Sequence, residues 1–395
     1  MHRVLIPWEH YVNVTRGSVK VQMGDLYPRW VGTRELLLHG RNPYSPEVSH
    51  EIQMAYYGHA IEQTYDKPDS EIIDEQRFAY PIYIVFLLAP TVHADFPRLQ
   101  EWAPVFLGVS VAVGVLAWMS ILQWRPPIVF TAAIILFVVS SPQIAQDLRL
   151  RQFAPLVASL LALASWCVVR NHFWIAGVLL GFSTIKPQMV LLCLVWFFIW
   201  TLGDWKNRWP LAAGFSGTLC ALVGAGEWLL PGWPRYFVEG LIAYRKYFHA
   251  LSTSPVRLIL GDWIGGIVSV LAVAALLAYS WRKRELTADT WDFSHTLGLF
   301  FVATTLVLPL LVPGNHVLIL LPLLMLICDW AALPIWARCG FAILVTWPVL
   351  VSSIMLLHPP QLESMQRTPL LPSALVLLFP FFALCFMLAR KRVES

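Results

Sequence analysis

The chain alternates between long apolar runs and short polar connections. Twelve runs are long enough, or nearly long enough, to cross a bilayer as helices: 80–95, 102–124, 127–141, 152–169, 172–186, 188–203, 209–231, 263–281, 294–312, 315–332, 336–357 and 370–389. Crossing the bilayer core takes about 20 apolar residues, so the shorter runs reach across it only in part. The pattern predicts an all-α fold, a polytopic transmembrane helical bundle of about 11–12 hydrophobic segments.

Two longer polar stretches interrupt this pattern. We expect residues 1–79 to form an N-terminal extramembrane or interfacial region and residues 80–395 to form the transmembrane domain. Residues 232–262 are expected as an extracytoplasmic loop of that domain. The loop mixes aromatic and basic residues, a composition that suits sugar and phosphate binding and equally suits an interfacial helix.

The N-terminal region contains one short amphipathic helix after Asp25. Asp25 can cap its start, Pro28 suits its first turn and Gly40 suits its end. Trp30, Leu37 and Leu38 are expected to lie along the membrane surface.

The run from His172 to Gly203 is interrupted at Lys186-Pro187, which predicts a tight helical hairpin. Lys186 then carries a charge inside an apolar hairpin. Such charges are expensive and usually functional, although a lysine can also extend its amine to the interface.

Basic residues flank the apolar runs at six sites: Arg125, Arg170, Lys206 with Arg208, Arg282 to Arg284, Arg338 and Arg390 to Arg392. Two apolar runs separate each neighbouring pair, so all six sites can be cytoplasmic together, as the positive-inside rule requires. The opposite side then receives the connections at 147–152, 186–188, 232–262, 313–315 and 358–369.

The side occupied by residues 1–79 depends on the run 80–95. If this run crosses the membrane, residues 1–79 are cytoplasmic; if it does not, they lie outside. The run is short and carries Pro81 and Pro90, so a re-entrant or interfacial segment is one of the two alternatives.

Composition narrows the class of protein. Hydrophobic residues make up 57% of the chain and charged residues only 13%, about half the charged fraction of a soluble domain. The net charge of +4 is scattered, so no nucleic-acid partner is expected. The six cysteines lie in or beside apolar runs, without metal-ligand spacing, and no glycine-rich phosphate loop is present.

Several short motifs follow one another along the chain: Asp25 before a short helix, Gly40-Arg41-Asn42-Pro43-Tyr44, Phe78-Ala79-Tyr80-Pro81, Ala176-Gly177, Ile185-Lys186-Pro187-Gln188 and Pro313-Gly314-Asn315-His316. Together they resemble glycosyltransferase family 87, whose members are membrane enzymes of the GT-C type, similar to polyprenol-phosphate-mannose-dependent mannosyltransferases. Their order and spacing carry the resemblance. The chain departs from the family in three places: residues 1–23 are too polar for the usual first helix, Arg151-Gln152-Phe153 replaces a Gly-Gln pair, and no serine precedes Pro313.

The resemblance implies transfer of a sugar, mannose by analogy, from a polyprenyl-phosphate donor to a hydroxyl of a glycan or glycolipid on the extracytoplasmic face. It places Asp25 as the base that takes the acceptor proton; a simple helix cap is the alternative. It places Lys186 and His316 at the donor phosphate. The negative charge on this phosphate grows as it leaves the sugar, so nearby cations stabilise it. For His316 the alternative is a polar residue at the start of a helix.

Six further residues enter the substrate-binding set through their place in these motifs or on the same face: Arg29, Tyr44, Arg151, Gln152, Gln188 and Asn315. Arg29 is equally suited to be a solvated surface arginine. No cofactor or metal is expected. The expected location is the plasma membrane, in a multi-pass arrangement. Two other functions stay open: a transporter or flippase of lipid-linked sugars, and a non-catalytic membrane assembly protein.

Overall fold

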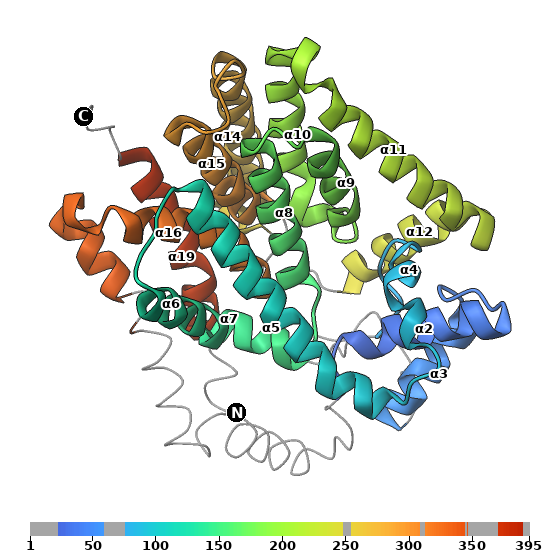
Figure 1. Ribbon diagram of the computed structural model, residues 1–395. Coiled ribbons are helices and arrows are strands. Elements are labelled where there is room, and N and C mark those ends of the chain that lie inside the picture. The colour runs from blue at the N-terminus through green and yellow to red at the C-terminus, as the bar shows by residue number, and fades with distance from the viewer. Residues whose placement is uncertain are drawn as a thin grey trace, which may run out of the picture. The chain divides into compact units, whose positions relative to one another are not determined.

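The computed structural model describes residues 23–58, 76–247, 254–308, 313–343, 346 and 370–389. Every regular element in these ranges is a helix, which confirms the predicted all-α fold (Figure 1). The chain divides into two compact units. The first unit comprises Met1–Gly108, Asp147–Phe153 and Leu219–Ala250, and the second comprises Val109–Gln146, Ala154–Thr218 and Leu251–Ser395. The predicted boundary after residue 79 stays a prediction.

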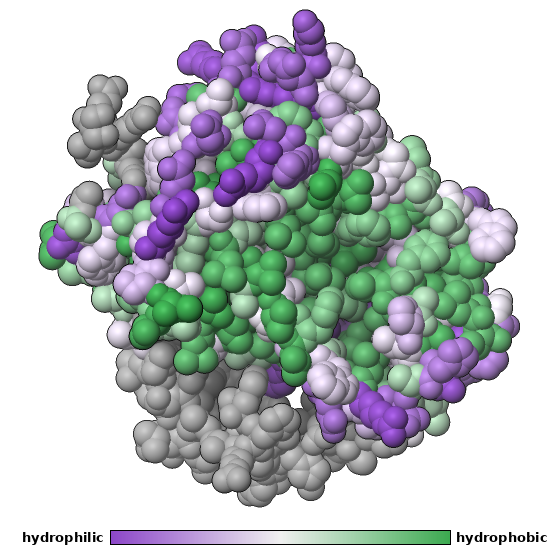
Figure 2. Space-filling model, viewed as in Figure 1, coloured by the Kyte–Doolittle hydropathy of each residue, from purple (hydrophilic) through white to green (hydrophobic). Residues whose placement is uncertain are grey.

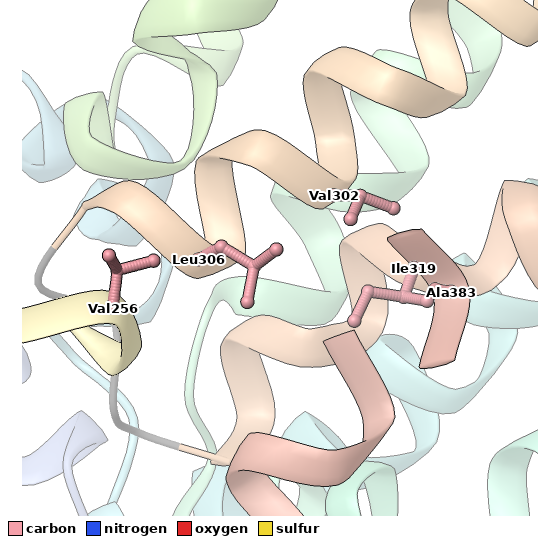
Figure 3. Close-up of a cluster of buried hydrophobic side chains, with 5 residues drawn as sticks. All are labelled: Val256, Val302, Leu306, Ile319 and Ala383. Atoms are coloured by element: carbon pink, nitrogen blue, oxygen red, sulfur yellow. The ribbon is translucent and has the colours of Figure 1, made fainter. Parts of the chain in front are cut away.

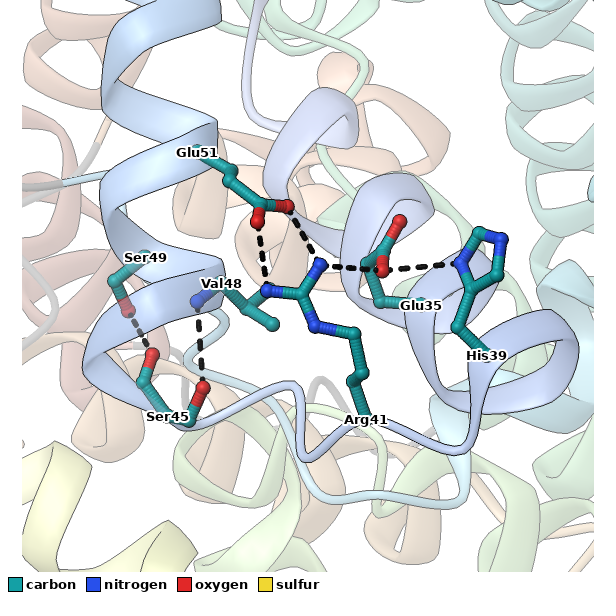
Figure 4. Close-up of polar contacts among 7 residues, drawn as sticks. All are labelled: Glu35, His39, Arg41, Ser45, Val48, Ser49 and Glu51. Atoms are coloured by element: carbon teal, nitrogen blue, oxygen red, sulfur yellow. Dashed lines mark hydrogen bonds and ion pairs between the residues drawn. The ribbon is translucent and has the colours of Figure 1, made fainter.

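The first unit begins with helices α2 (Leu26–His39) and α3 (Pro46–Tyr57), which pack against each other. Helix α2 ends at Gly40, as predicted, and Ser45 caps α3 by accepting a hydrogen bond from the Val48 amide. Arg41 bridges the two helices, because its guanidinium bonds Glu51 at 2.6 and 3.0 Å and Glu35 at 3.0 Å (Figure 4). This network fixes the turn between α2 and α3.

The run 80–95 forms only helix α4 (Ile84–Leu88) and the 3-10 turn η3 (Ala89–Thr91). Both are far too short to cross a bilayer, so the structure favours the alternative in which this run does not span. Helix α4 packs against α2. Trp30 is buried in this contact and donates its indole N–H to the Thr91 carbonyl at 3.1 Å. The expectation that Trp30 lies along the membrane surface is therefore wrong.

The second unit contains the predicted hairpin. It consists of α9 (Phe173–Ser183) and α10 (Pro187–Gly203), with the turn at Thr184 to Lys186 between them. The rings of Phe173 and Trp200 lie 5.9 Å apart, so the start of α9 lies beside the end of α10. Helix α8 (Ala154–Val169) packs along α9, and α15 (Trp291–Val307) packs along α10.

Basic residues gather at the end of the second unit away from the hairpin turn. Arg208 is buried there and donates to the carbonyls of Trp200, Arg284 and Leu286 at 2.7 to 2.9 Å. Figure 2 shows hydrophilic side chains at this end, over the turns that follow α10 and α14 (Asp262–Arg282). Two of the six predicted cytoplasmic sites, at Arg208 and at Arg282 to Arg284, thus lie together.

Within the described ranges, three helices are long and apolar enough to cross a membrane: α5 (Phe96–Ile121), α11 (Trp205–Leu229) and α14. A fourth span is formed if the bent pair α6 (Ile128–Ser140) and α7 (Pro142–Leu150) counts as one. Five shorter apolar helices accompany them, among them α8, α9 and α10. Apolar side chains are exposed along α6, where Ile128 is 84% and Val129 77% exposed (Figure 2). Such a surface suits lipid rather than water.

The core of the second unit includes a cluster that ties four elements together. Val256 of α13 (Pro255–Leu260), Val302 and Leu306 of α15, Ile319 of the 3-10 helix η4 (Pro313–Ile319) and Ala383 of α19 (Leu370–Ala389) are all buried and in contact (Figure 3). The remaining described elements are α16 (Leu320–Cys328) and the 3-10 turn η5 (Trp330–Ala332). The cluster anchors α13, which carries Arg257, to the unit.

Residues 232–262 are largely helical where the structure describes them. They form α12 (Trp233–Tyr247), which belongs to the first unit, and α13, which belongs to the second. The interfacial position of this stretch and its binding of sugar or phosphate both stay predictions. Most of the predicted run 336–357 and the predicted connection 358–369 lie outside the described residues.

Candidate active site

The carboxylate of Asp25 does not cap helix α2. Asp25 occupies the cap position, but its backbone is already helical and its side chain makes no capping hydrogen bond. Instead, Oδ2 accepts a hydrogen bond of 2.5 Å from the side-chain amide of Gln152, 127 residues later in the chain. The simple capping alternative is therefore wrong in this structure. The carboxylate is half-buried and held by a distant amide, an arrangement that suits a proton acceptor of fixed orientation.

The C-terminal end of α7 and the two residues after it present Gln152 to Asp25, so the connection predicted at 147–152 is helical through Leu150. The Gln152 amide donates to the Asp147 carbonyl at 2.9 Å, and the Asp25 amide donates to the Leu150 carbonyl at 2.8 Å. Gly24 is required at this contact, since its φ is +63° and a Cβ there would lie 2.7 Å from the Leu150 oxygen. One backbone hydrogen bond, from Asp25 to Leu150, and one side-chain hydrogen bond, from Gln152 to Asp25, thus join the start of α2 to the end of α7.

Arg151 stabilises the end of α7 and does not contact the carboxylate of Asp25 in the described structure. Its φ is +56°, a left-handed conformation that is uncommon for a residue with a side chain. Its guanidinium donates to the carbonyls of Gln100 at 3.2 Å and Arg149 at 2.8 Å. Strain of this kind persists where surrounding contacts impose it, often beside functional groups. These contacts hold the backbone immediately before Gln152.

Arg29 lies one helical turn after Asp25 and points back toward it. Its guanidinium donates to the backbone carbonyl of Asp25 and lies 4.9 Å from the centre of the Tyr80 ring. Arg29 is half-buried, so the alternative of a freely solvated surface arginine does not fit the structure. The positive charge of the Arg29 guanidinium therefore lies close to Asp25, at the start of α2.

Tyr44 holds Tyr80 in place. The Tyr44 hydroxyl donates to the Tyr80 carbonyl at 2.6 Å, and its ring packs edge-on against Phe78 at 5.1 Å. Burial raises the pKa of the Tyr44 hydroxyl, so it remains protonated at neutral pH. The two motifs that resemble family 87 at 40–44 and 78–81 therefore meet in the structure.

Asp147 was not predicted as a site residue, yet it lies near Tyr80 together with Asp25 and Arg29. Its side chain is only 1% exposed, and its carboxylate, that of Asp25 and the guanidinium of Arg29 all act electrostatically on the Tyr80 hydroxyl. A second carboxylate thus accompanies Asp25 in the first unit. In the sequence Asp147 is one polar residue of a turn, and nothing in its neighbours signals burial.

The second unit holds a separate polar cluster at the turn of the α9–α10 hairpin. Lys186 is 6% exposed, and its ammonium donates to the Asn315 side chain at 3.1 Å, a contact across 129 residues. The amine is therefore held inside the protein and does not extend to the interface. Gln188, in the first turn of α10, is exposed.

His316 follows Asn315 at the start of η4 and is 4% exposed. Within the described part of the chain, neither ring nitrogen has a hydrogen-bond partner. Leaving a buried polar group unpaired costs about 1–3 kcal/mol, so such groups call for an explanation. A ligand with acceptor oxygens at this cluster would pair the His316 ring.

The predicted site residues thus fall into two groups. Asp25, Arg29, Tyr44, Arg151 and Gln152 belong to the first unit, and Lys186, Gln188, Asn315 and His316 belong to the second. Among the described residues, no three His, Cys, Asp or Glu side chains are grouped as a metal site would require.

Glu227 has a local role. Its carboxylate accepts a hydrogen bond of 2.7 Å from the Gly232 amide and so closes the turn between α11 and α12. The described contacts do not assign it to either group of site residues.

The sequence profile of glycosyltransferase family 87 matches residues 78–309. That range holds Arg151, Gln152, Lys186 and Gln188, whereas Asp25, Arg29, Tyr44, Asn315 and His316 lie outside it. No curated protein and no solved structure matches the chain.

Proposed function

This chain belongs to glycosyltransferase family 87, whose profile covers more than half of it, and we propose that this membrane glycosyltransferase moves a hexose, mannose by analogy, from a polyprenyl-phosphate donor to an acceptor hydroxyl. We place the reaction on the extracytoplasmic face of the plasma membrane, with a glycan or glycolipid as the acceptor. One observation supports the proposal above the rest: the Asp25 carboxylate is released from helix capping and fixed by Gln152.

Asp25 acts as the general base in this proposal. As the acceptor oxygen attacks C1 of the sugar, its proton passes to Asp25, the bond between C1 and the phosphate oxygen breaks, and the lipid phosphate leaves. A positioned base of this kind contributes about 10²–10⁴-fold to the rate. Gln152 and Arg29 position the residue through its carboxylate and its carbonyl.

Lys186, Asn315 and His316 bind the donor phosphate in this proposal. The Lys186 ammonium balances the charge that grows on the leaving phosphate. His316 supplies a ring N–H that lacks a described partner. Lys186→Met should therefore lower kcat, because the charge on the leaving phosphate grows in the transition state, while the midpoint temperature of unfolding stays close to that of wild type.

Two features support the extracytoplasmic face. Helix α10 has 17 residues, so Lys186 at its start lies about 25 Å from its basic end, close to the thickness of the bilayer core. The run 80–95 forms no span, which favours an outside position for residues 1–79. In a cysteine-free background, Gln188→Cys should react with an impermeant maleimide from outside, and Asn207→Cys only from inside. The reverse pattern would refute this orientation.

The activity is tested with purified protein in vesicles, radiolabelled polyprenyl-phosphate-mannose and a panel of alkyl mannosides as acceptors. Wild type should transfer mannose, Asp25→Asn should lose at least about 100-fold in kcat, and Asp95→Asn, an exposed carboxylate control, should be unaffected. Full activity in Asp25→Asn would refute the base assignment. Movement of the donor lipid across vesicles without transfer would favour the transporter.

A further inference from the structure

A groove of about 500 Å³ opens beside the start of α14 in the second unit. Arg257 and Asp262 form its charged end, and Trp263, Ile267 and Leu271 line its apolar length. Positions 263, 267 and 271 are spaced by four residues, so they lie along one face of the helix. The groove thus leads from two charges along an apolar stripe.

The packing of α13 on α14 builds the groove. A Cβ at Gly265 would lie 2.5 Å from the Cα of Arg257, so only glycine lets the two backbones approach this closely. The next residue, Gly266, leaves room for the Arg257 guanidinium, whose nearest atom would lie 3.5 Å from a Cβ there. Val256 anchors α13 in the core cluster of Figure 3. Arg257 is therefore held in place by its neighbours.

The depth of the groove in the bilayer follows from the length of α14. The helix has 21 residues and is about 31 Å long, enough to cross the bilayer core. Arg282 to Arg284 follow its far end, so Arg257 and Asp262 mark the opposite head-group level. The apolar stripe then runs from the head groups into the hydrocarbon. Trp263, Ile267 and Leu271 are 84, 52 and 62% exposed, as expected for side chains that lipid covers.

The charges define what can bind. Arg257 is exposed, and its guanidinium has no hydrogen-bond or ion-pair partner among the described residues. Asp262 lines the same groove without forming an ion pair with it in the described structure. An arginine at head-group depth attracts phosphate, and a nearby carboxylate accepts hydrogen bonds from hydroxyl or ammonium groups.

We propose that this groove binds one membrane phospholipid, with its phosphodiester on Arg257, the hydroxyl or ammonium of its head group on Asp262, and one chain along Trp263, Ile267 and Leu271. None of the residues that line the groove is a proposed catalytic or donor-binding residue, and the proposal does not depend on the proposed function. A phosphate-free lipid lacks the group that Arg257 recognises.

Native mass spectrometry of the full chain, released from micelles doped with phosphatidylethanolamine or with diacylglycerol, tests the site. Wild type should retain one phosphatidylethanolamine and no diacylglycerol. Arg257→Gln should weaken retention about tenfold or more, the loss of one charge-assisted hydrogen bond. Gly266→Leu keeps the charge but fills the groove, and it should weaken retention equally. The Cβ that it adds meets only the Arg257 guanidinium, at an ordinary contact distance of 3.5 Å or more, so folding should be preserved.

Arg282→Gln is the matched control, since it removes an exposed arginine from the other end of the same helix, outside the groove. It should retain the lipid as wild type does. Equal loss in Arg282→Gln would mean general attraction of lipid to basic residues and would overturn the proposal. Wild-type retention in both Arg257→Gln and Gly266→Leu, or equal retention of diacylglycerol, would overturn it as well.

Discussion

The contact between α9 and α11 gives the sharpest test of how the fold holds the hairpin that carries Lys186. Gly177 and Gly181 are four residues apart on α9 and face Gly214 and Thr218 of α11, so that the two backbones touch. A Cβ at Gly214 would lie 2.6 Å from the Trp174 carbonyl oxygen, where about 3.4 Å is an ordinary contact. Small residues spaced in this way are typical of close helix pairs in membranes.

Gly214→Ala must therefore move α9 away from α11 by about 0.8 Å, the difference between these two distances. Overpacking of this kind costs about 1–3 kcal/mol. Gly217, one turn later on α11, has nothing within 4 Å of an added Cβ. Gly217→Ala should therefore be neutral or stabilise by up to about 1 kcal/mol, through the better helix propensity of alanine.

Thermal unfolding in detergent, followed by size-exclusion chromatography, should show opposite signs for the two variants. The apparent midpoint should fall by several degrees in Gly214→Ala and hold or rise in Gly217→Ala. Since α9 leads directly into the turn at Lys186, Gly214→Ala should also lower transfer activity at temperatures where it remains folded. If Gly214→Ala is as stable as Gly217→Ala, the close backbone contact does not exist and the reasoning fails.

Three further outcomes follow from single contacts. Gln152→Ala should lower kcat about 10–100-fold with little change in donor KM, because the lost hydrogen bond of about 1.5–3 kcal/mol orients the Asp25 carboxylate. Gln152→Asn keeps the amide on a shorter side chain and serves as the comparison. Equal kcat in wild type and Gln152→Ala would refute this role. His316→Phe should abolish transfer while the midpoint temperature of unfolding stays level or rises, because it removes two unpaired buried nitrogens. A large drop in stability would contradict the absence of hydrogen bonds at the His316 ring. Arg208→Met should destabilise by about 2–4 kcal/mol, because three carbonyls lose their donor; Lys206→Met, an exposed neighbour, should be silent in the same unfolding assay.

Local signals in the sequence predicted local structure well. Gly40 ends α2, and Lys186-Pro187 marks the turn of the hairpin, because helix stops and prolines act on the backbone around them. The charge pattern also predicted that Arg208 and Arg284 lie at one end, where they now share a hydrogen bond of 2.9 Å. These predictions required no knowledge of distant contacts.

Contacts between segments far apart in the chain could not be predicted from the sequence. Gln152 entered the site through a family motif, but nothing along the chain indicated that it would bind Asp25 across 127 residues. Asp147 was missed for the same reason, since burial of a polar residue depends on what packs over it. Trp30 was placed at the membrane surface by its helical position, whereas α4 and η3 cover it in the structure.

Burying Lys186, Asn315 and His316 lowers the stability of this fold. That cost favours a functional role for the cluster. Each side chain is less than 10% exposed, yet the surrounding helices are apolar enough to have accepted leucine or phenylalanine instead. An apolar replacement of similar shape is commonly neutral or stabilising. A buried ammonium also raises the cost of placing this turn in the interior. Sequences depart from such local rules mainly at functional sites. A phosphate at this cluster would supply an acceptor for the unpaired His316 ring. Binding should therefore stabilise the protein, and excess lipid-phosphate should raise the midpoint temperature of wild type but not of His316→Phe.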